Sequence, residues 1–261
     1  MEQVLAFVPT VILILCRITS FFVVAPVFSF RTIPNSFKVG LAAAVTLITF
    51  TVVGSQSPVQ MDGLFFLLII REIMVGILLG FVATLFFNAV QIAGFYMDMQ
   101  IGFSMANIID PMTGVSSPLL GNFKFMIAIM LFLTFNGHHY FLQAIMDSYR
   151  WIPLDNGLFG QLANGSLSDF LVRTFATVFT IAFQLALPVL AAMLLTDIGL
   201  GLLTRVSPQF NIFVIGVPLK IIIGLVVLTI LFPGFISLFH DLFMQMFETM
   251  KQMLGLIGKT G

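Results

Sequence analysis

Long apolar runs dominate this chain and restrict the folds open to it. Seven segments are predicted as helices, the last of them amphipathic: residues 4–30, 39–53, 64–87, 123–135, 170–203, 212–232 and 237–254. The longest runs exceed the roughly 20 residues that a helix needs to cross a bilayer. Only 8% of the 261 residues are charged, against about 25% in ordinary soluble domains. The sequence therefore predicts surroundings of lipid or of other apolar protein.

The runs predict helices rather than strands. Backbone groups in lipid must find partners within the protein, which leaves helices or closed barrels, and barrel strands would alternate over about ten residues. The fold class is therefore all-α: a hydrophobic multi-helix bundle of membrane type with kinked helices and a C-terminal helical hairpin. Pro188 is expected to kink its helix, and Pro233 with Gly234 to end the sixth run. Gly76 and Gly80 form a small-xxx-small pair that would let another helix approach closely.

Several function classes find no support in the sequence. The net charge is zero and no basic run exists, which argues against nucleic acid as a partner. His138 and His139 are adjacent rather than four apart, so we expect no metal site. No nucleophile or nucleotide motif is present, and we expect neither a cofactor nor an enzyme. The start of the chain lacks the features of a cleavable signal peptide, and we expect a retained first helix.

Six charged residues lie in or beside apolar runs, where each costs about 2.5–3.5 kcal/mol at the centre of a bilayer. They are Arg17, Arg71, Glu72, Asp197, Arg205 and Lys220. One interpretation is a charged pathway for ions or substrate, and the other is a buried network that holds helices or subunits together. Arg71 and Glu72 are adjacent and would project about 100° apart, so we do not expect them to face each other, and at least one should need a partner on another helix or chain. Asp197 and Arg205 are two turns apart, roughly 11 Å, which is too far for a direct pair.

An unusual interruption separates two apolar runs at residues 96–122, which read YMDMQIGFSMANIIDPMTGVSSPLLGN. The segment is rich in methionine, glycine and proline, and it is too apolar for an ordinary solvated loop. Irregular backbone at membrane depth is tolerated where it is buried in protein or lines a cavity. Two interpretations stay open, a plain surface connection and a re-entrant or occluding loop.

Four stretches carry a resemblance to a known family. They are TDIGLGLLTRVSPQFNIFVIGVPLKI (196–221), RITSFFVVAPVFSFRTIPNSFKVGLA (17–42), REIMVGILLGF (71–81) and QIAGFYMDMQIGFSMANIIDPMTGVSSPLLGNF (91–123). Together they resemble the FliR family of flagellar export proteins, which also includes the T-type proteins of virulence secretion systems. The resemblance covers essentially the whole chain. It implies a single export-gate domain over 1–261, with a FliP-like part at about 1–206 and a FliQ-like hairpin at about 207–261.

The resemblance also implies a function and partners. Such a protein would form part of a channel for unfolded flagellar proteins together with FliP and FliQ. FlhB and FlhA would be further partners, and membrane lipid would surround the complex in the bacterial inner membrane at the flagellar basal body. The central loop would plug the closed pore, and our own hypothesis is that Gly114 and Gly121 are its flexible points when it moves aside. On this chain the plug corresponds to Asn107, Asp110, Pro111, Met112, Gly114, Pro118, Gly121 and Asn122.

Two other function classes serve as alternatives. A secondary transporter would use Glu72 and Asp197 as ion-coupling carboxylates, since carriers place such groups within apolar helices. Transporters often consist of two repeated halves, and we find no such repeat. A membrane-embedded enzyme would need convergent polar groups, and none are visible in the sequence.

Overall fold

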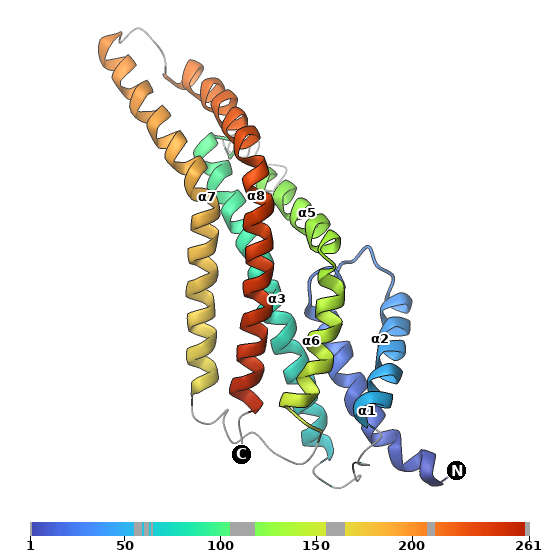
Figure 1. The fold of residues 1–261 in the computed structure, drawn as a ribbon. Helices are drawn as coiled ribbons and strands as arrows, with labels where there is room; N and C mark the ends of the chain where they lie inside the picture. Colours follow the sequence, from blue (N-terminus) through green and yellow to red (C-terminus); the bar gives the residue numbers. More distant parts are fainter. Residues whose placement is uncertain are drawn as a thin grey trace. The chain divides into compact units, whose positions relative to one another are not determined.

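The computed structural model describes residues 2–54, 59, 63, 65–104, 118–154, 165–207 and 212–258. All regular secondary structure among these residues is helical, with turns between the helices, which confirms the all-α class. The helices are α1 (Glu2–Val24), α2 (Asn35–Thr49), α3 (Phe65–Ile101), α5 (Leu119–Thr134), α6 (Gly137–Trp151), α7 (Ser166–Val206) and α8 (Ile212–Gly258), and α2 ends in a π-helical turn, η1 (Phe50–Gly54). Figure 1 follows them along the chain. Five of the described helices are long and apolar enough to cross a membrane.

The chain divides into two compact units. Unit 1 comprises Met1–Leu85, Asn136–Phe175 and Met244–Gly261, and unit 2 comprises Phe86–Phe135 and Ala176–Phe243. The long helices α3, α7 and α8 each contribute residues to both units, whereas α5 belongs to unit 2 and α6 to unit 1. Each unit is described below by itself.

In unit 1, α1 packs closely against the first half of α3. The pair of glycines predicted as a contact surface lies at this crossing: a Cβ atom at Gly76 would collide with the α1 backbone, and one at Gly80 would lie 2.9 Å from Cβ of Val24. The hydroxyl of Thr84 donates a hydrogen bond to the carbonyl of Val24 at 3.0 Å. Small residues on α3 therefore allow the backbones to meet, as the sequence predicted.

In unit 2, aromatic rings and small residues hold α3, α5 and α8 together. The rings of Phe87, Phe132 and Phe243 lie with their centroids 5.2–5.5 Å apart, a separation at which aromatic pairs attract. Gly94 of α3 and Gly121 of α5 face each other so closely that a Cβ on Gly94 would overlap the backbone of α5. The second half of α3 is therefore closely fitted to the start of α5.

The predicted break at Pro233 and Gly234 is wrong. α8 is one helix from Ile212 to Gly258 with Pro218 and Pro233 inside it. A proline removes one backbone hydrogen bond, but apolar helices tolerate it where neighbours restore the packing. Phe235 and Phe239, directly after this proline, are both buried in unit 2, so side-chain packing continues across the site.

The helix α6 (Gly137–Trp151) was missed by the sequence analysis. Its polar residues, including His138, His139 and Asp147, interrupt any apolar run, so a criterion of run length passes over it. Phe141, Ile145, Ser148 and Tyr149 form its buried face at three- and four-residue spacing, which is the pattern of an amphipathic helix.

Candidate functional site

A fully buried charged residue, Arg17, lies on α1 in unit 1. Its side chain is fully buried and binds Glu72 of α3 through two parallel hydrogen bonds, Nε to Oε2 at 2.5 Å and Nη2 to Oε1 at 3.0 Å. Its remaining donors reach Ser148 Oγ at 2.8 Å and the carbonyl of Ile152 at 3.0 Å. The ring of Tyr149 lies 4.0 Å from the guanidinium carbon. A planar fork of this kind matches the geometry of a carboxylate.

The same carboxylate also binds its neighbour in sequence. Arg71 Nη2 lies 2.9 Å from Glu72 Oε1, and it also donates to the carbonyl of Pro153 at 2.8 Å. The expectation that Arg71 and Glu72 would not face each other is therefore wrong, whereas the expectation that one of them has a partner on another helix is confirmed by Arg17 of α1. The wrong expectation followed from the angle between adjacent residues on a helix and neglected the length of the arginine side chain, which folds back to its neighbour.

We call Arg17, Arg71, Glu72 and Ser148 the Arg17 cluster. It ties α1, α3 and α6 together. Glu72 is fully buried, and both of its carboxylate oxygens accept from arginine side chains. A carboxylate that couples transport must gain and lose a proton or an ion. The geometry therefore favours the network interpretation of these charges over the transporter alternative.

A second, more exposed pair lies in unit 2. Asp197 of α7 accepts from Lys220 Nζ of α8 at 2.8 Å and from Gln100 Nε2 of α3 at 3.0 Å. The Asp197 side chain is 40% exposed and that of Lys220 is 19% exposed. Arg205 is exposed, and it takes part in no ion pair with the described residues. Asp197 therefore finds its cation on the facing helix rather than eight residues along its own.

The base of the central loop carries a further carboxylate that sequence reasoning missed. Asp98 of α3 is buried and accepts from the backbone N–H groups of Leu120, at 3.0 Å, and Gly121, at 3.4 Å, in the first turn of α5. A helix N-terminus has free N–H groups and a positive dipole end, and an aspartate satisfies both. The sequence does carry one indication of this contact, because Asp98 is an isolated acidic residue in an otherwise apolar stretch. Its partners lie 22 residues away, beyond the reach of spacing arguments.

The predicted plug residues fall into two groups. Asn107, Asp110, Pro111, Met112 and Gly114 lie outside the described residues. Pro118, Gly121 and Asn122 begin α5, where the N–H of Asn122 donates to the carbonyl of Pro118 at 3.0 Å. Gly121 is buried, lies against Gly94 and donates its N–H to Asp98. These contacts hold the backbone at Gly121 in place, whereas the hypothesis from the sequence was that Gly121 is a flexible point of the loop.

A second missed charge is Lys124, on α5 in unit 2. Its side chain is buried, and its Nζ lies 3.5 Å from the centre of the Phe235 ring. Nζ has no hydrogen-bond partner among the residues that the structure describes. A cation over an aromatic face is attracted by the ring, but that attraction replaces only part of the lost hydration.

These features define a class of protein: a multi-span helical membrane protein whose inner charges join helices. Within the described residues no group of histidine, cysteine and acidic side chains could hold a metal ion. The chain belongs to the family of bacterial export proteins, family 1, whose family model matches residues 8–246.

Named relatives refine this assignment. The chain is 36% identical to the flagellar biosynthetic protein FliR of Bacillus subtilis over 99% of both chains. It is 32% identical to FliR of Escherichia coli, over 92% of this chain and 91% of that protein. It is also 31% identical to the Yop proteins translocation protein T of Yersinia pestis, over 85% of each. The chain is thus a FliR-family protein of the export apparatus, with a role in type III protein export.

Proposed function

We propose that this chain is a non-enzymatic subunit of the flagellar export gate and forms part of the channel for unfolded flagellar proteins with FliP and FliQ. FlhB and FlhA are the further partners in this proposal, and the inner membrane at the flagellar basal body is the location. The relatives with the highest identity quoted above are flagellar, which supports the flagellar over the virulence branch.

The surface of unit 2 supports assembly with apolar partners. Ile222, Val226 and Ile230 follow one another at four-residue spacing on α8 and are 60%, 54% and 72% exposed. On α7, Leu194 and Leu195 are 57% and 70% exposed. Positions four apart lie on one helix face, so α8 presents an apolar stripe that either lipid or neighbouring helices must cover.

The observation that carries the plug proposal is the anchored base of the central loop. Asp98 and the contact of Gly94 with Gly121 hold the start of α5 on the second half of α3. Residues 105–117 connect these two fixed points. A loop with a rigid base can occlude a pore and move aside without unpacking the helices that carry it. Its methionines suit a seal that adapts to different passing side chains.

Co-purification tests the assembly. The chain, tagged after Gly261, would be extracted from its native membrane in mild detergent and its partners identified by mass spectrometry. Recovery of FliP and FliQ with the chain supports the proposal. A stable, homogeneous chain recovered alone would contradict it and return attention to a self-sufficient transporter.

Membrane permeability tests the plug. Deleting part of 107–117 should make cells leak small molecules, because the closed channel loses its seal. The matched control deletes the same number of residues from 155–164, a connection between α6 and α7. Equal permeability of both deletion strains and the wild type, with assembly confirmed by co-purification, would refute the plug.

A further inference from the structure

The buried lysine of unit 2, Lys124, lies beside a small cavity between α5 and α8. The cavity has a volume of about 50 Å³, and its lining residues all belong to unit 2. Three of them are phenylalanines of α8, and Lys124 has the only polar side chain among them. A water molecule takes about 30 Å³ of the liquid, so a group as small as a carboxylate fits this cavity.

Unit 2 offers Lys124 no anion among the residues that the structure describes. These include three acidic side chains, Asp98, Asp197 and Asp241. Asp98 binds the backbone at the start of α5, and Asp197 binds a lysine of α8. Asp241 is exposed, and its Oδ1 lies 3.7 Å from Nδ1 of His240. Nζ of Lys124 has no hydrogen-bond partner within the described residues, so a buried charge is left there without a counter-charge.

The aromatic ring beside the ammonium group does not complete its interactions. Nζ lies 3.5 Å from the centre of the Phe235 ring, and the face of the ring attracts the charge. An ammonium group has three N–H donors, however, and the ring covers one side of it. Lys124 is the single charged residue of α5, and ionisable residues within apolar helices usually pair with one another across helices. Lys124 therefore indicates an acidic side chain that comes from outside the described part of the chain.

The cavity borders an apolar surface on which a helix can pack. Phe123 of α5 and Phe232 of α8 line the cavity and are exposed. Met126 and Met130 follow Phe123 at spacings of three and four residues and are also exposed, so these three side chains share one face of α5. Methionine adapts to irregular partner surfaces. This face suits an apolar helix of another chain, with one acidic side chain directed at Lys124.

A carboxylate fits this site better than the phosphate of a lipid does. The cavity is lined by one cation and by no further polar side chain, so a single negative charge makes a neutral pair. A phosphate has more acceptor oxygens, and proteins usually bind it through several donors at once. The small volume of the cavity also favours the end of a side chain over a lipid headgroup.

We propose that Lys124 receives an aspartate or glutamate side chain of a partner subunit, carried on an apolar helix that packs on Phe123, Met126 and Phe232. This contact rests on the proposed function, which supplies the partner subunits. In the free chain the buried ammonium group lacks a counter-charge, whereas in the complex the pair is neutral. The contact therefore selects a helix with an acidic residue at the matching position over a purely apolar helix.

Cross-linking identifies the partner side chain. The complex recovered through the tag after Gly261 would be treated with dicyclohexylcarbodiimide, an apolar reagent that activates carboxyl groups. An adjacent amine then displaces the urea, and an amide bond joins the two side chains. We expect peptide mapping to find Lys124 joined to an aspartate or glutamate of another chain, with the pair of Asp197 and Lys220 as internal control for the chemistry. Lys124 joined within its own chain, or unmodified while the control pair is joined, would overturn the proposal.

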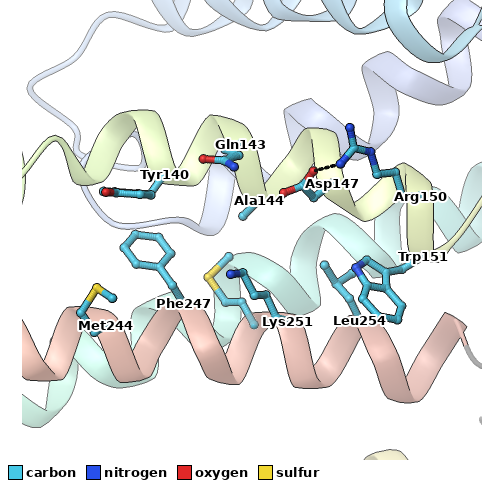
Figure 2. Close-up of a pocket in the computed structure, with 11 residues that line it drawn as sticks. Tyr140, Gln143, Ala144, Asp147, Arg150, Trp151, Met244, Phe247, Lys251 and Leu254 are labelled. Atoms are coloured by element: carbon cyan, nitrogen blue, oxygen red, sulfur yellow. Dashed lines mark ion pairs between the residues drawn. The ribbon is translucent and has the colours of Figure 1, made fainter.

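The dissociation rate of the partner measures the contribution of the pair. Lys124→Met should release the partner more than about tenfold faster, because a buried carboxylate then loses its cation. The matched control is Lys251→Met, which should leave the rate unchanged, because Lys251 is exposed and lines a wider groove of about 610 Å³ in unit 1 (Figure 2). Lys124→Glu should also release the partner, and substitution of the cross-linked acid by lysine should restore binding.

The outcomes separate this contact from the export role. Equal dissociation rates for Lys124→Met and Lys251→Met would refute the contact and leave the export proposal intact. A wild-type chain recovered without partners would contradict both. A phospholipid that co-purifies with the wild type but not with Lys124→Met, while the release of partners is unchanged, would overturn the carboxylate in favour of a phosphate.

Discussion

Substituting Glu72 by glutamine should destabilise the protein strongly. The change removes the carboxylate partner of Arg17, which is fully buried. Removing one partner of a buried ion pair typically costs about 3–5 kcal/mol, because the remaining charge stays in a medium of low polarity. Ser148 and the carbonyl of Ile152 still accept from Arg17, so the arginine loses its counter-charge but not all of its hydrogen bonds.

Thermal unfolding in detergent measures this cost. For a chain of this size, 1 kcal/mol corresponds to about 2–4 °C in Tm, so we expect a decrease of about 6–20 °C. Cys16 is the single cysteine and lies beside Arg17 on α1, partly shielded from solvent. A thiol-reactive dye therefore reports the opening of the cluster itself, and size-exclusion chromatography after heating reports the whole fold.

Asp197→Asn supplies the control, since it also removes one carboxylate from an ion pair. Its pair with Lys220 is partly exposed, and exposed pairs contribute about 1 kcal/mol or less. The expected decrease in Tm is therefore at most about 4 °C. The double variant Arg17→Met, Glu72→Met should lose less than the sum of its two single changes. Equal decreases for Glu72→Gln and Asp197→Asn would refute the argument that burial determines the cost.

Three further predictions concern unit 2. Gly94→Ala should lower Tm because the added methyl collides with the backbone of α5 at Gly121, whereas Gly40→Ala, with no atom within 4 Å, should not; equal Tm values would contradict this. Asp98→Asn should cost about 1–2 kcal/mol by weakening the cap of α5, measurable as faster amide exchange at Leu120 and Gly121; unchanged exchange would exclude a capping role. Lys124→Met should leave Tm unchanged or raise it, because a buried cation without a hydrogen-bond partner is replaced by an apolar side chain of similar length; a lower Tm would show that the Phe235 contact outweighs burial.

Much of the fold could be predicted from run length and small residues. The long apolar segments are α1, α3 and α7, and α3 continues beyond the predicted range 64–87 to Ile101. Gly76 and Gly80 lie at a helix crossing. These features are local, because a helix in an apolar medium is set by its own backbone hydrogen bonds. The kink at Pro188 stays a prediction, as do the division near residue 206 and the single domain over 1–261.

The partners of the buried charges could not be predicted. Arg17 binds Ser148 and the carbonyl of Ile152, which lie on and just after a helix that run length did not reveal. Asp98 finds its donors on the far side of the central loop. In both cases the sequence indicates that a charge needs a partner, but which partner depends on helix packing. The angle between two positions on a helix predicts contacts only for short side chains. The long side chain of Arg71 folds back and reaches the adjacent Glu72.

The pairing of these charges changes the argument about assembly. The sequence suggested that neighbouring subunits supply partners for the charged side chains, but Arg17, Arg71, Glu72, Asp197 and Lys220 find partners within the chain. Binding between subunits then cannot rest on these ion pairs. Apolar side chains in lipid gain nothing from mere burial, so association must come from close packing of complementary shapes. The exposed β-branched stripe on α8 suits this role, because such side chains are stiff and lose little entropy on contact.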